Sequence, residues 1–360
     1  MERKSKRLTG ALDAVEGGQM SFWAGKKVLV TGGAGFIGSH TVELLLSQAP
    51  DVRVTVPGRF SGRSPENLAA VASRIRLEEA DLRRPEDCAR VCRGVEVVLN
   101  VAGCTGGIAY NMARPATLFR DNIRISTNML EAAQAAKAER FLVVSSACVY
   151  SRECPVPTPE KEGFSGWPEP TNEGYGWAKR MAEFEAMAAA KEFGLKVAIA
   201  RPYNAYGPRD HFDPEVSHVI AALIRKAVDG EDPVRVWGEG NQTRAFLYVE
   251  DCARGLLETA ERYAECDPVN LGSDEEVPVS ELARLIVELS GTKARLQFEP
   301  DRPSGYPRRS ADVSKALAKV GFKTRVPLRE GIKRTIDWYA ALSPKRRGPP
   351  EGSTPPRGGR

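Results

Sequence analysis

Residues 27–38 read Lys27-Val-Leu-Val-Thr-Gly-Gly-Ala-Gly-Phe-Ile-Gly38. A β-branched run typical of a buried strand ends in glycines at positions 32, 35 and 38, and a helical pattern follows. Glycines at this spacing allow a tight turn, a close approach of the backbone to a diphosphate, and close packing of the helix on the strand. The N-terminus of the helix then faces the negative charge. Strand, turn and helix in this order predict a dinucleotide-binding site at the start of an α/β fold. The alternative is a glycine-rich turn that binds nothing.

Outward from this stretch, short β-branched runs alternate with longer helical patterns. Strands are expected at 27–30, 52–56, 75–79, 95–101, 141–145 and 197–199. Helices are expected at 38–46, 85–92, 118–136 and 175–193. The alternation predicts an α/β fold of the Rossmann type, in which a doubly wound parallel sheet carries helices on both faces. After Arg201, where Pro and Gly become frequent, a smaller mixed C-terminal domain is expected, with helices near 215–229, 250–262 and 279–290.

The two ends of the chain differ from its body. Residues 1–10 carry a net charge of +3 and residues 344–360 carry +4, which leaves −2 for the part between them out of a total of +5. We predict a flexible N-terminal arm (1–24), a mainly NAD(P)-binding Rossmann domain (25–200), a mainly substrate-binding domain (201–342) and a disordered basic tail (343–360). Because the positive charge lies at the ends, a groove for nucleic acid is not expected.

The composition excludes other classes of protein. With 42% hydrophobic and 28% charged residues among 360, the chain can bury a sizeable core. No window approaches about 18 consecutive apolar residues, so no membrane-spanning helix is expected. Seven cysteines and three histidines at irregular spacings indicate neither a disulfide framework nor a metal site. Reduced thiols favour a cytoplasmic protein.

The second expected strand ends Val54-Thr-Val-Pro-Gly-Arg59, and Arg63 follows closely. An acidic residue normally stands at this point, on the 2′-hydroxyl of the ribose. An arginine would accept a 2′-phosphate instead, so Arg59 favours NADP. NAD is the alternative if Arg59 is only a solvated loop charge. Asp81 and Leu82, at the end of the third expected strand, are placed to contact the adenine.

A candidate catalytic group lies in the segment Tyr175-Gly-Trp-Ala-Lys179. A tyrosine and a lysine at this spacing share one face of a helix. A nearby cation stabilises the phenolate, so the tyrosine can exchange a proton with a substrate oxygen near neutral pH. Ser146, at the end of the fifth expected strand, supplies a hydroxyl that can hydrogen-bond the same oxygen.

The glycine-rich loop, this Ser/Tyr/Lys set and residues 201–208 together resemble the extended short-chain dehydrogenase/reductase (NAD-dependent epimerase/dehydratase) superfamily. The resemblance runs from about Lys26 to Leu342. It implies a nucleotide-diphosphate sugar as substrate, bound by the smaller domain, and commonly a homodimer formed through a four-helix bundle. It also implies hydride transfer between the sugar C4 and the nicotinamide, with Tyr175 as acid/base. The residues predicted to bind the cofactor are Gly32, Gly35, Phe36, Ile37, Gly38, Arg59, Asp81, Leu82, Ala102, Tyr175, Lys179 and Pro202.

The segment Ser145-Ser-Ala-Cys-Val-Tyr150 narrows the subgroup. The 4,6-dehydratases and sugar decarboxylases carry a catalytic carboxylate in this run, and none stands here. Cys148 resembles the cysteine of GDP-L-fucose synthases and GDP-mannose 3,5-epimerases, and His218 stands where the synthases have their second acid/base. A thiol and an imidazole on opposite sides of a sugar can invert C3 and C5 beside a C4 ketone, since both can titrate near neutrality. The structural alternatives are a packing cysteine and a helix-capping histidine.

Other segments divide between these two enzymes. Glu169-Pro-Thr-Asn-Glu173 and Ser217-His-Val-Ile220 are similar to the synthases, whereas Gln242-Thr-Arg-Ala-Phe246 and Val269-Asn-Leu-Gly-Ser273 look more like the 3,5-epimerases. We expect an NADP-dependent epimerase/reductase of the GDP-L-fucose-synthase type. The alternatives are a redox-neutral nucleotide-sugar epimerase with bound NAD(P), acting at C3/C5 or C4, and a non-catalytic NADP-sensing protein.

The resemblance also implies a set of substrate-binding residues. Arginine suits a diphosphate because its planar fork donates two parallel hydrogen bonds. Arg308, before Asp312, resembles the late arginine that contacts the diphosphate in related enzymes. The alternative for each charged residue is an ordinary surface position. The full set is Asn204, His218, Lys226, Trp237, Arg244 and Arg308.

Overall fold

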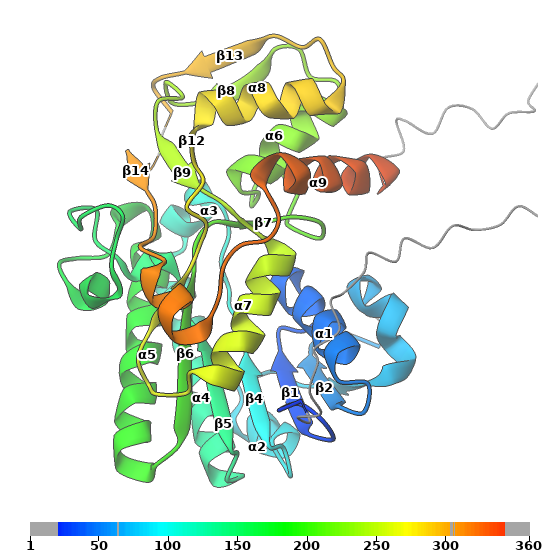
Figure 1. Cartoon of the computed structure of the whole chain (residues 1–360), viewed down its shortest axis with the longest axis vertical. Coiled ribbons are helices and arrows are strands. Elements are labelled where there is room, and N and C mark those ends of the chain that lie inside the picture. Colours follow the sequence, from blue (N-terminus) through cyan, green and yellow to red (C-terminus); the bar gives the residue numbers. More distant parts are fainter. Residues whose placement is uncertain (1–20, 63–64, 303–304, 306, 343–360) are drawn as a thin grey trace, which may run out of the picture.

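The computed structural model describes residues 21–62, 65–302, 305 and 307–342. Its central sheet is built from seven parallel strands, which are β1 (Lys27–Thr31), β2 (Arg53–Gly58), β3 (Ile75–Glu79), β4 (Val97–Asn100), β5 (Arg140–Val144), β6 (Lys196–Pro202) and β11 (Val269–Leu271). They lie in the order β11-β6-β5-β4-β1-β2-β3 (Figure 1). The order reverses between β1 and β4, and open α/β sheets bind ligands in the crevice at the carboxyl ends of such strands.

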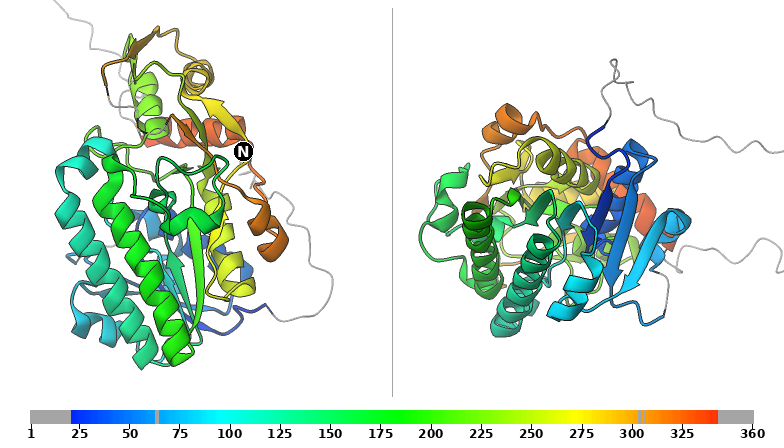
Figure 2. Two further views of the ribbon diagram at one scale, coloured as in Figure 1. Left: turned by 90° about the vertical axis from the view of Figure 1, so that its left-hand side faces the viewer. Right: turned by 90° about the horizontal axis from the view of Figure 1, so that it is seen from below.

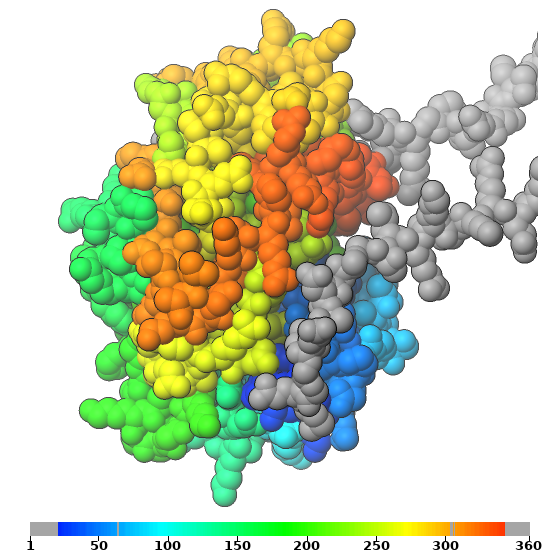
Figure 3. Space-filling model, in the orientation of Figure 1, coloured from blue at the N-terminus to red at the C-terminus, as the bar shows by residue number. Residues whose placement is uncertain are grey.

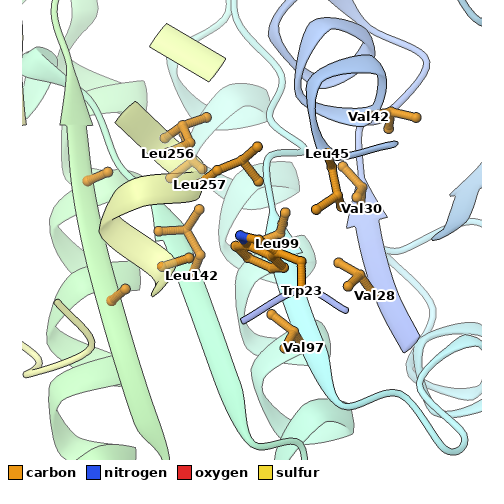
Figure 4. Close-up of a cluster of buried hydrophobic side chains, with 14 of the residues drawn as sticks. Trp23, Val28, Val30, Val42, Leu45, Val97, Leu99, Leu142, Leu256 and Leu257 are labelled. Carbon is orange, nitrogen blue, oxygen red and sulfur yellow. The ribbon is translucent and has the colours of Figure 1, made fainter. Parts of the chain in front are cut away.

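Helices α1 (Phe36–Gln48) and α7 (Val249–Arg262) cover one face of the sheet. Side chains of β1, β4 and β5 meet Leu45 of α1 and Leu256 and Leu257 of α7 in one buried cluster (Figure 4). Trp23, just before β1, is buried in the same cluster. Each large apolar side chain buried in this way stabilises the fold by about 1.5–3 kcal/mol, so α7 is an integral part of the sheet domain.

The other face carries α2 (Pro85–Val91), α4 (Pro115–Ala135) and α5 (Glu173–Phe193), which pack over a second buried cluster. Proline is the first residue of both α2 and α4, where its missing N–H costs nothing. Helix α5 ends at Gly194, whose φ of 73° is the left-handed conformation of a helix cap. The long helices α4 and α5 lie side by side on the outside of the molecule (Figure 2, left).

A smaller region lies at the top of Figure 1. Here α6 (Val219–Val228), α8 (Val279–Ser290) and α9 (Leu328–Leu342) pack with the parallel strands β8 (Val234–Trp237) and β13 (Leu296–Glu299) around a third buried cluster. The short sheets of this region are β12 (Glu276–Pro278), β9 (Thr243–Ala245) and β14 (Arg308–Arg309), and the pair β7 (Ala205–Tyr206) and β10 (Leu247–Tyr248).

Several short helices connect these elements. They are η1 (Glu66–Arg74), α3 (Ile108–Ala113), η2 (Ala147–Val149), η3 (Glu160–Phe164), η4 (Pro170–Asn172) and the π-helical η5 (Ala316–Val320). Ala316 and Val320 of η5 join the buried cluster under α7. In the space-filling view this segment, in orange, lies against the yellow surface of α7 (Figure 3).

The predicted fold class is confirmed: the chain folds as a Rossmann-type α/β protein with a parallel sheet. The six expected strands correspond to β1–β6, and the seven expected helices correspond to α1, α2 and α4–α8. Two features lay beyond the predictions. The chain returns to the central sheet after residue 201, since α7 and β11 complete it, and α9 closes the smaller region.

Some sequence predictions concern residues outside the described part of the chain. They are most of the flexible arm (residues 1–20), the basic tail (343–360) and Arg63. Within the described residues, no helix is both long enough and apolar enough to cross a bilayer. No cluster of three or more His, Cys, Asp or Glu with the geometry of a metal site occurs among them either. All seven cysteines, each of which is described, are free thiols.

Candidate active site

The glycine-rich loop between β1 and α1 forms a tightly packed cradle. Gly32 has a φ of 64°, and a Cβ there would lie 2.9 Å from the backbone nitrogen of Ala102. A Cβ on Gly38 would overlap the carbonyl oxygen of Gly32. Gly35 is the N-cap of α1 and has no side chain with which to cap it, so the first N–H groups of the helix stay free to face an anion. The loop therefore fits the diphosphate of a dinucleotide, with Phe36 and Ile37 in the first turn.

The loop after β4 is fixed against this cradle. Thr31 Oγ1 donates to Asn100 Oδ1 at 2.8 Å and accepts from the backbone N–H of Ala102 at 3.0 Å. Cys104, two residues after Ala102, is held by Asn122 of α4. The Asn122 side chain accepts from the N–H of Cys104 and donates to its carbonyl, both at 2.9 Å. Ala102 is thus held at the carboxyl edge of the sheet between β1 and β4, where the predicted cofactor would pass.

The predicted adenine end lies at the carboxyl ends of β2 and β3. Asp81 forms an ion pair with Arg83 at 2.7 Å, and hydrogen bonds from Arg83 hold the pKa of Asp81 well below its ordinary value. The next residue, Leu82, is buried, and its carbonyl accepts from Asn128 at 3.1 Å. Arg59, directly after β2, is exposed and lies within electrostatic reach of Asp81. The structure therefore brings Arg59 and Asp81 to one end of the crevice.

Three consecutive residues at the end of β5 hold the face of α5 that carries Tyr175, Lys179 and Glu183. The carbonyl of Val144 accepts from Lys179 Nζ at 2.8 Å. The Ser145 hydroxyl donates to the Glu183 carboxylate, and the Ser146 hydroxyl hydrogen-bonds Tyr175. Parallel alignment of the strand end and the helix face thus sets the Ser146–Tyr175–Lys179 geometry that the spacing predicted.

The environment of this group tunes its proton affinity. Burial raises the pKa of Tyr175 above its ordinary value, and the hydrogen bond from Ser146 opposes that shift. Burial lowers the pKa of Lys179 to about 8. The Lys179 ammonium lies 5.5 Å from the centre of the Tyr175 ring. A tyrosine kept protonated beside an ammonium can donate its proton to a substrate oxygen and then be stabilised as phenolate.

Cys148 lies next to the same group, and His218 lies at the start of α6, within electrostatic reach of Arg309. Cys148 stands in η2, and its N–H donates to the Ser146 hydroxyl at 3.1 Å. His218 is the N-cap of α6, and its Nδ1 lies 3.4 Å from Asp210 Oδ1. Partial burial lowers the pKa of His218, but the hydrogen bond and charge of Asp210 outweigh it, so the pKa lies above its ordinary value.

Arg309 of β14 connects these residues. Its Nη2 donates to Cys148 Sγ at 3.5 Å, and its charge acts on both Tyr175 and His218. The sequence predicted Arg308 as a substrate-binding residue and gave no local signal for Arg309. In the structure Arg308 forms a two-pronged ion pair with Glu276 on the exposed side of β14, with both shortest contacts at 2.9 Å. Asp210, which faces His218, was also missed.

The other predicted substrate residues lie in the smaller region. Asn204 has a φ of 39° and donates to the carbonyl of Ala245 at 2.7 Å. Lys226 donates to a backbone carbonyl at 2.6 Å, and burial lowers its pKa. Trp237 is 40% exposed, and the guanidinium of Arg302 lies 5.6 Å from the centre of its ring. Arg244 on β9 is the register partner of Arg309 on β14. Pro202, at the end of β6, is the register partner of Leu271 on β11.

Residues 28–272 match the NAD dependent epimerase/dehydratase family. The chain belongs to this family. It is 37% identical to GDP-L-fucose synthase 1 of Arabidopsis thaliana over 246 residues, which are 67% of this chain and 76% of that protein. It is 33% identical to the dTDP-4-dehydro-6-deoxy-D-allose reductase of a Streptomyces species over 326 residues, which are 88% and 97% of the two chains.

Among solved structures, the UDP-glucose 4-epimerase of Thermotoga maritima with UDP-glucose superposes with a TM-score of 0.79 at 29% identity and covers 88% of this chain and 99% of its own. By their names, these relatives of the epimerase/dehydratase family member are a GDP-L-fucose synthase, a dTDP-sugar reductase and a UDP-glucose 4-epimerase. The protein is therefore an enzyme of the NAD-dependent epimerase/dehydratase family, as the resemblance implied.

Proposed function

We propose that this protein is an NADP-dependent nucleotide-sugar epimerase/reductase of the GDP-L-fucose-synthase type. It would invert C3 and C5 of a 4-keto sugar nucleotide and reduce the ketone at C4. The observation that carries the proposal is that Arg309 contacts Cys148 and lies within electrostatic reach of both Tyr175 and His218. A plain C4 reductase has no use for a second pair of proton-transfer side chains. The GDP-L-fucose synthase among its relatives supports the same assignment.

The residues would act in two stages. Cys148 removes the proton from the carbon next to the C4 ketone, and His218 returns a proton to the opposite face. Tyr175 then donates its hydroxyl proton to the C4 oxygen, while Ser146 hydrogen-bonds that oxygen and Lys179 stabilises the phenolate. NADPH, when bound on the glycine-rich cradle, supplies the hydride to C4.

The preference for NADP rests on Arg59. It is exposed at the end of β2, where no carboxylate of the segment 54–59 competes for the ribose. A guanidinium in that place is suited to a 2′-phosphate. The Asp81 carboxylate is paired with Arg83, and we expect Asp81 to contact the adenine end of the cofactor.

A redox-neutral epimerase with bound NAD(P) is the second candidate. It is supported by the fold similarity to a UDP-glucose 4-epimerase over almost the whole of that chain. In such an enzyme Tyr175 would take a proton from the C4 hydroxyl and return it, with no net consumption of the cofactor.

We infer a homodimer formed through α4 and α5. These helices lie side by side on the outside of the molecule (Figure 2). They expose the side chains of Phe119 (39%) and Phe184 (61%). Paired with a second copy, the two helices would form a four-helix bundle that buries both rings. The seven free thiols suit a reducing cytoplasm.

The proposed function is tested with purified protein, NADPH and a panel of 4-keto sugar nucleotides with guanine, uracil or thymine bases. Loss of NADPH absorbance together with inversion at C3 and C5 is expected. Tyr175→Phe is the matched control and should reduce the rate by about 10² or more, because the general acid is lost. Isomerisation without loss of NADPH would favour the redox-neutral epimerase. If no member of the panel reacts, the result would favour a non-catalytic NADP-sensing protein.

A further inference from the structure

Asp210 and Arg309 carry opposite charges next to the two residues of the proton-transfer pair. Asp210 follows β7 in the loop that leads to α6, and Arg309 stands on β14, about 100 residues further along the chain. Each contacts a different member of the pair. Asp210 faces His218 and Arg309 faces Cys148.

The Asp210 carboxylate is buried in a way that calls for a cationic neighbour. Its side chain is 1% exposed. Oδ1 accepts from the N–H of His211 at 2.7 Å and faces His218 Nδ1 at 3.4 Å. Oδ2 is buried and has no hydrogen-bond partner among the described residues. A carboxylate so placed is costly unless a positive charge compensates it, and a protonated His218 supplies that charge.

The same contact fixes which ring nitrogen of His218 is available. An Nδ1–H donated to Asp210 leaves Nε2, on the other side of the ring, to exchange a proton with a substrate. The His218 side chain is 44% exposed, so the ring is not closed off from a substrate. The 3.4 Å separation is long for a hydrogen bond, as is common in free enzymes before the substrate tightens the site.

Arg309 places a positive charge next to Cys148, the other member of the pair. A guanidinium is always protonated, and a cation next to a thiol favours the thiolate, which is the form that acts as a base. Within the described residues, the charges acting on His218 are those of Asp210 and Arg309. From α5, Tyr175 and Lys179 also lie within electrostatic reach of Cys148.

We propose that Asp210 and Arg309 are positioning residues that support the roles of the pair: Asp210 orients His218 as the acid, and Arg309 donates to the sulfur of Cys148 and stabilises the negative charge on it when it acts as the base. The inference rests on the proposed function and adds to it the two residues that support each role. The thiolate takes the C–H proton next to the C4 ketone, and the electron pair of that bond moves into an enolate. The imidazolium then gives its proton to the opposite face of the same carbon. Cys148 ends as a thiol and His218 as a neutral imidazole, so solvent restores both before the second inversion.

The acid side is tested by an NMR titration of the three histidines in substrate-free protein. In Asp210→Asn the pKa of His218 should fall below its ordinary value, because partial burial and Arg309, the two remaining effects, both lower it. In Arg309→Gln it should rise further, because one of those effects is removed. Asp213→Asn, the same substitution at an exposed position three residues away, should leave the His218 titration unchanged. An unchanged His218 titration in Asp210→Asn would overturn the assignment.

The base side is tested by alkylation of substrate-free protein with iodoacetamide at pH 7, followed at the Cys148 peptide by mass spectrometry. Arg309→Gln should slow the reaction about 10-fold or more, since only the thiolate reacts. Arg309→Lys, which keeps the charge, should recover most of the rate and so exclude simple misfolding. Arg308→Gln, whose partner is Glu276, is the matched control. Equal rates in wild type and Arg309→Gln would refute the role of Arg309.

Both read-outs use the protein without substrate. If they behave as expected but no sugar nucleotide is inverted at C3 or C5, the proposed function fails and the two positioning roles stand. If inversion occurs but neither read-out changes in the variants, the positioning roles fail and the function stands.

Discussion

Arg201 of β6 donates two hydrogen bonds to the Glu183 carboxylate of α5, from Nε at 2.8 Å and from Nη2 at 2.5 Å. The two side chains are 1% and 0% exposed. Ser145, the neighbour of Ser146, donates to the same carboxylate. The ion pair therefore joins α5 to the sheet one helical turn beyond Lys179.

Removing one partner of this pair should destabilise the whole fold. Arg201→Met leaves the Glu183 charge buried without compensation, which costs about 3–5 kcal/mol in comparable pairs. Urea unfolding followed by far-UV circular dichroism measures the loss. The double variant Arg201→Met/Glu183→Leu should recover much of it, because no charge is then left in the interior. A loss below about 1 kcal/mol in the single variant would show that the pair is not an essential support.

Burial of Lys179 should make stability depend on pH in a defined direction. Its pKa is about 8 in the folded protein and 10.5 for an ordinary lysine, so the unfolded chain binds this proton more tightly. The free energy of unfolding is therefore lowered below pH 8. It rises again between pH 8 and 10.5, by up to about 3 kcal/mol. The difference in unfolding free energy between wild type and Lys179→Met should shift in favour of wild type over this range. Lys191→Met, at the exposed end of the same helix, controls for loss of a lysine. A constant difference would contradict the burial effect.

Arg59 should decide between the two dinucleotides. Calorimetry should find tighter binding of NADPH than of NADH. Arg59→Ala should reduce this difference in binding free energy, because a charge-assisted contact contributes on the order of 1.5–3 kcal/mol. Arg53→Ala, at the opposite end of β2, is the control and should leave the difference as it is. Equal affinities of the unmutated protein for NADPH and NADH would contradict the proposed preference for NADP.

Cys148 should control exchange with solvent. A 4-keto substrate in D₂O should acquire deuterium at C3 or C5, and Cys148→Ser should reduce the uptake by about 10² or more because a hydroxyl is a poor base. Reduction of a 4-ketone that needs no epimerisation should continue through Tyr175. Cys154→Ser, another half-buried thiol, should keep normal uptake. Product with no solvent deuterium would favour the C4 epimerase.

Local patterns were enough to predict the strand–turn–helix of the cofactor site and the Tyr175/Lys179 face of α5. A glycine whose Cβ would overlap its own loop, as at Gly38, leaves a sequence signature because no other residue fits. Ser146 could be added because parallel strands end at one edge of the sheet. Each of these inferences needed only residues close in sequence or a rule of sheet geometry.

Arg309 and Asp210 could not be found in this way. Successive residues of a strand face opposite sides, so Arg308 and Arg309 exchange roles if the register of β14 shifts by one residue. That register is set by pairing with β9, about 65 residues earlier in the chain. The return of α7 and β11 to the central sheet was missed for a related reason, since local periodicity does not say which face a helix covers.

The position of α7 also bears on how the chain folds during synthesis. The apolar face that Leu256 and Leu257 cover belongs to strands that leave the ribosome first, and β6 ends about 50 residues before α7 begins. At about 5–20 residues per second, this face of the nascent sheet stays open for several seconds, with more delay until α7 clears the exit tunnel. The N-terminal half is therefore a natural client for chaperones that shield apolar surface, and a ribosome stalled before α7 would release an aggregation-prone product.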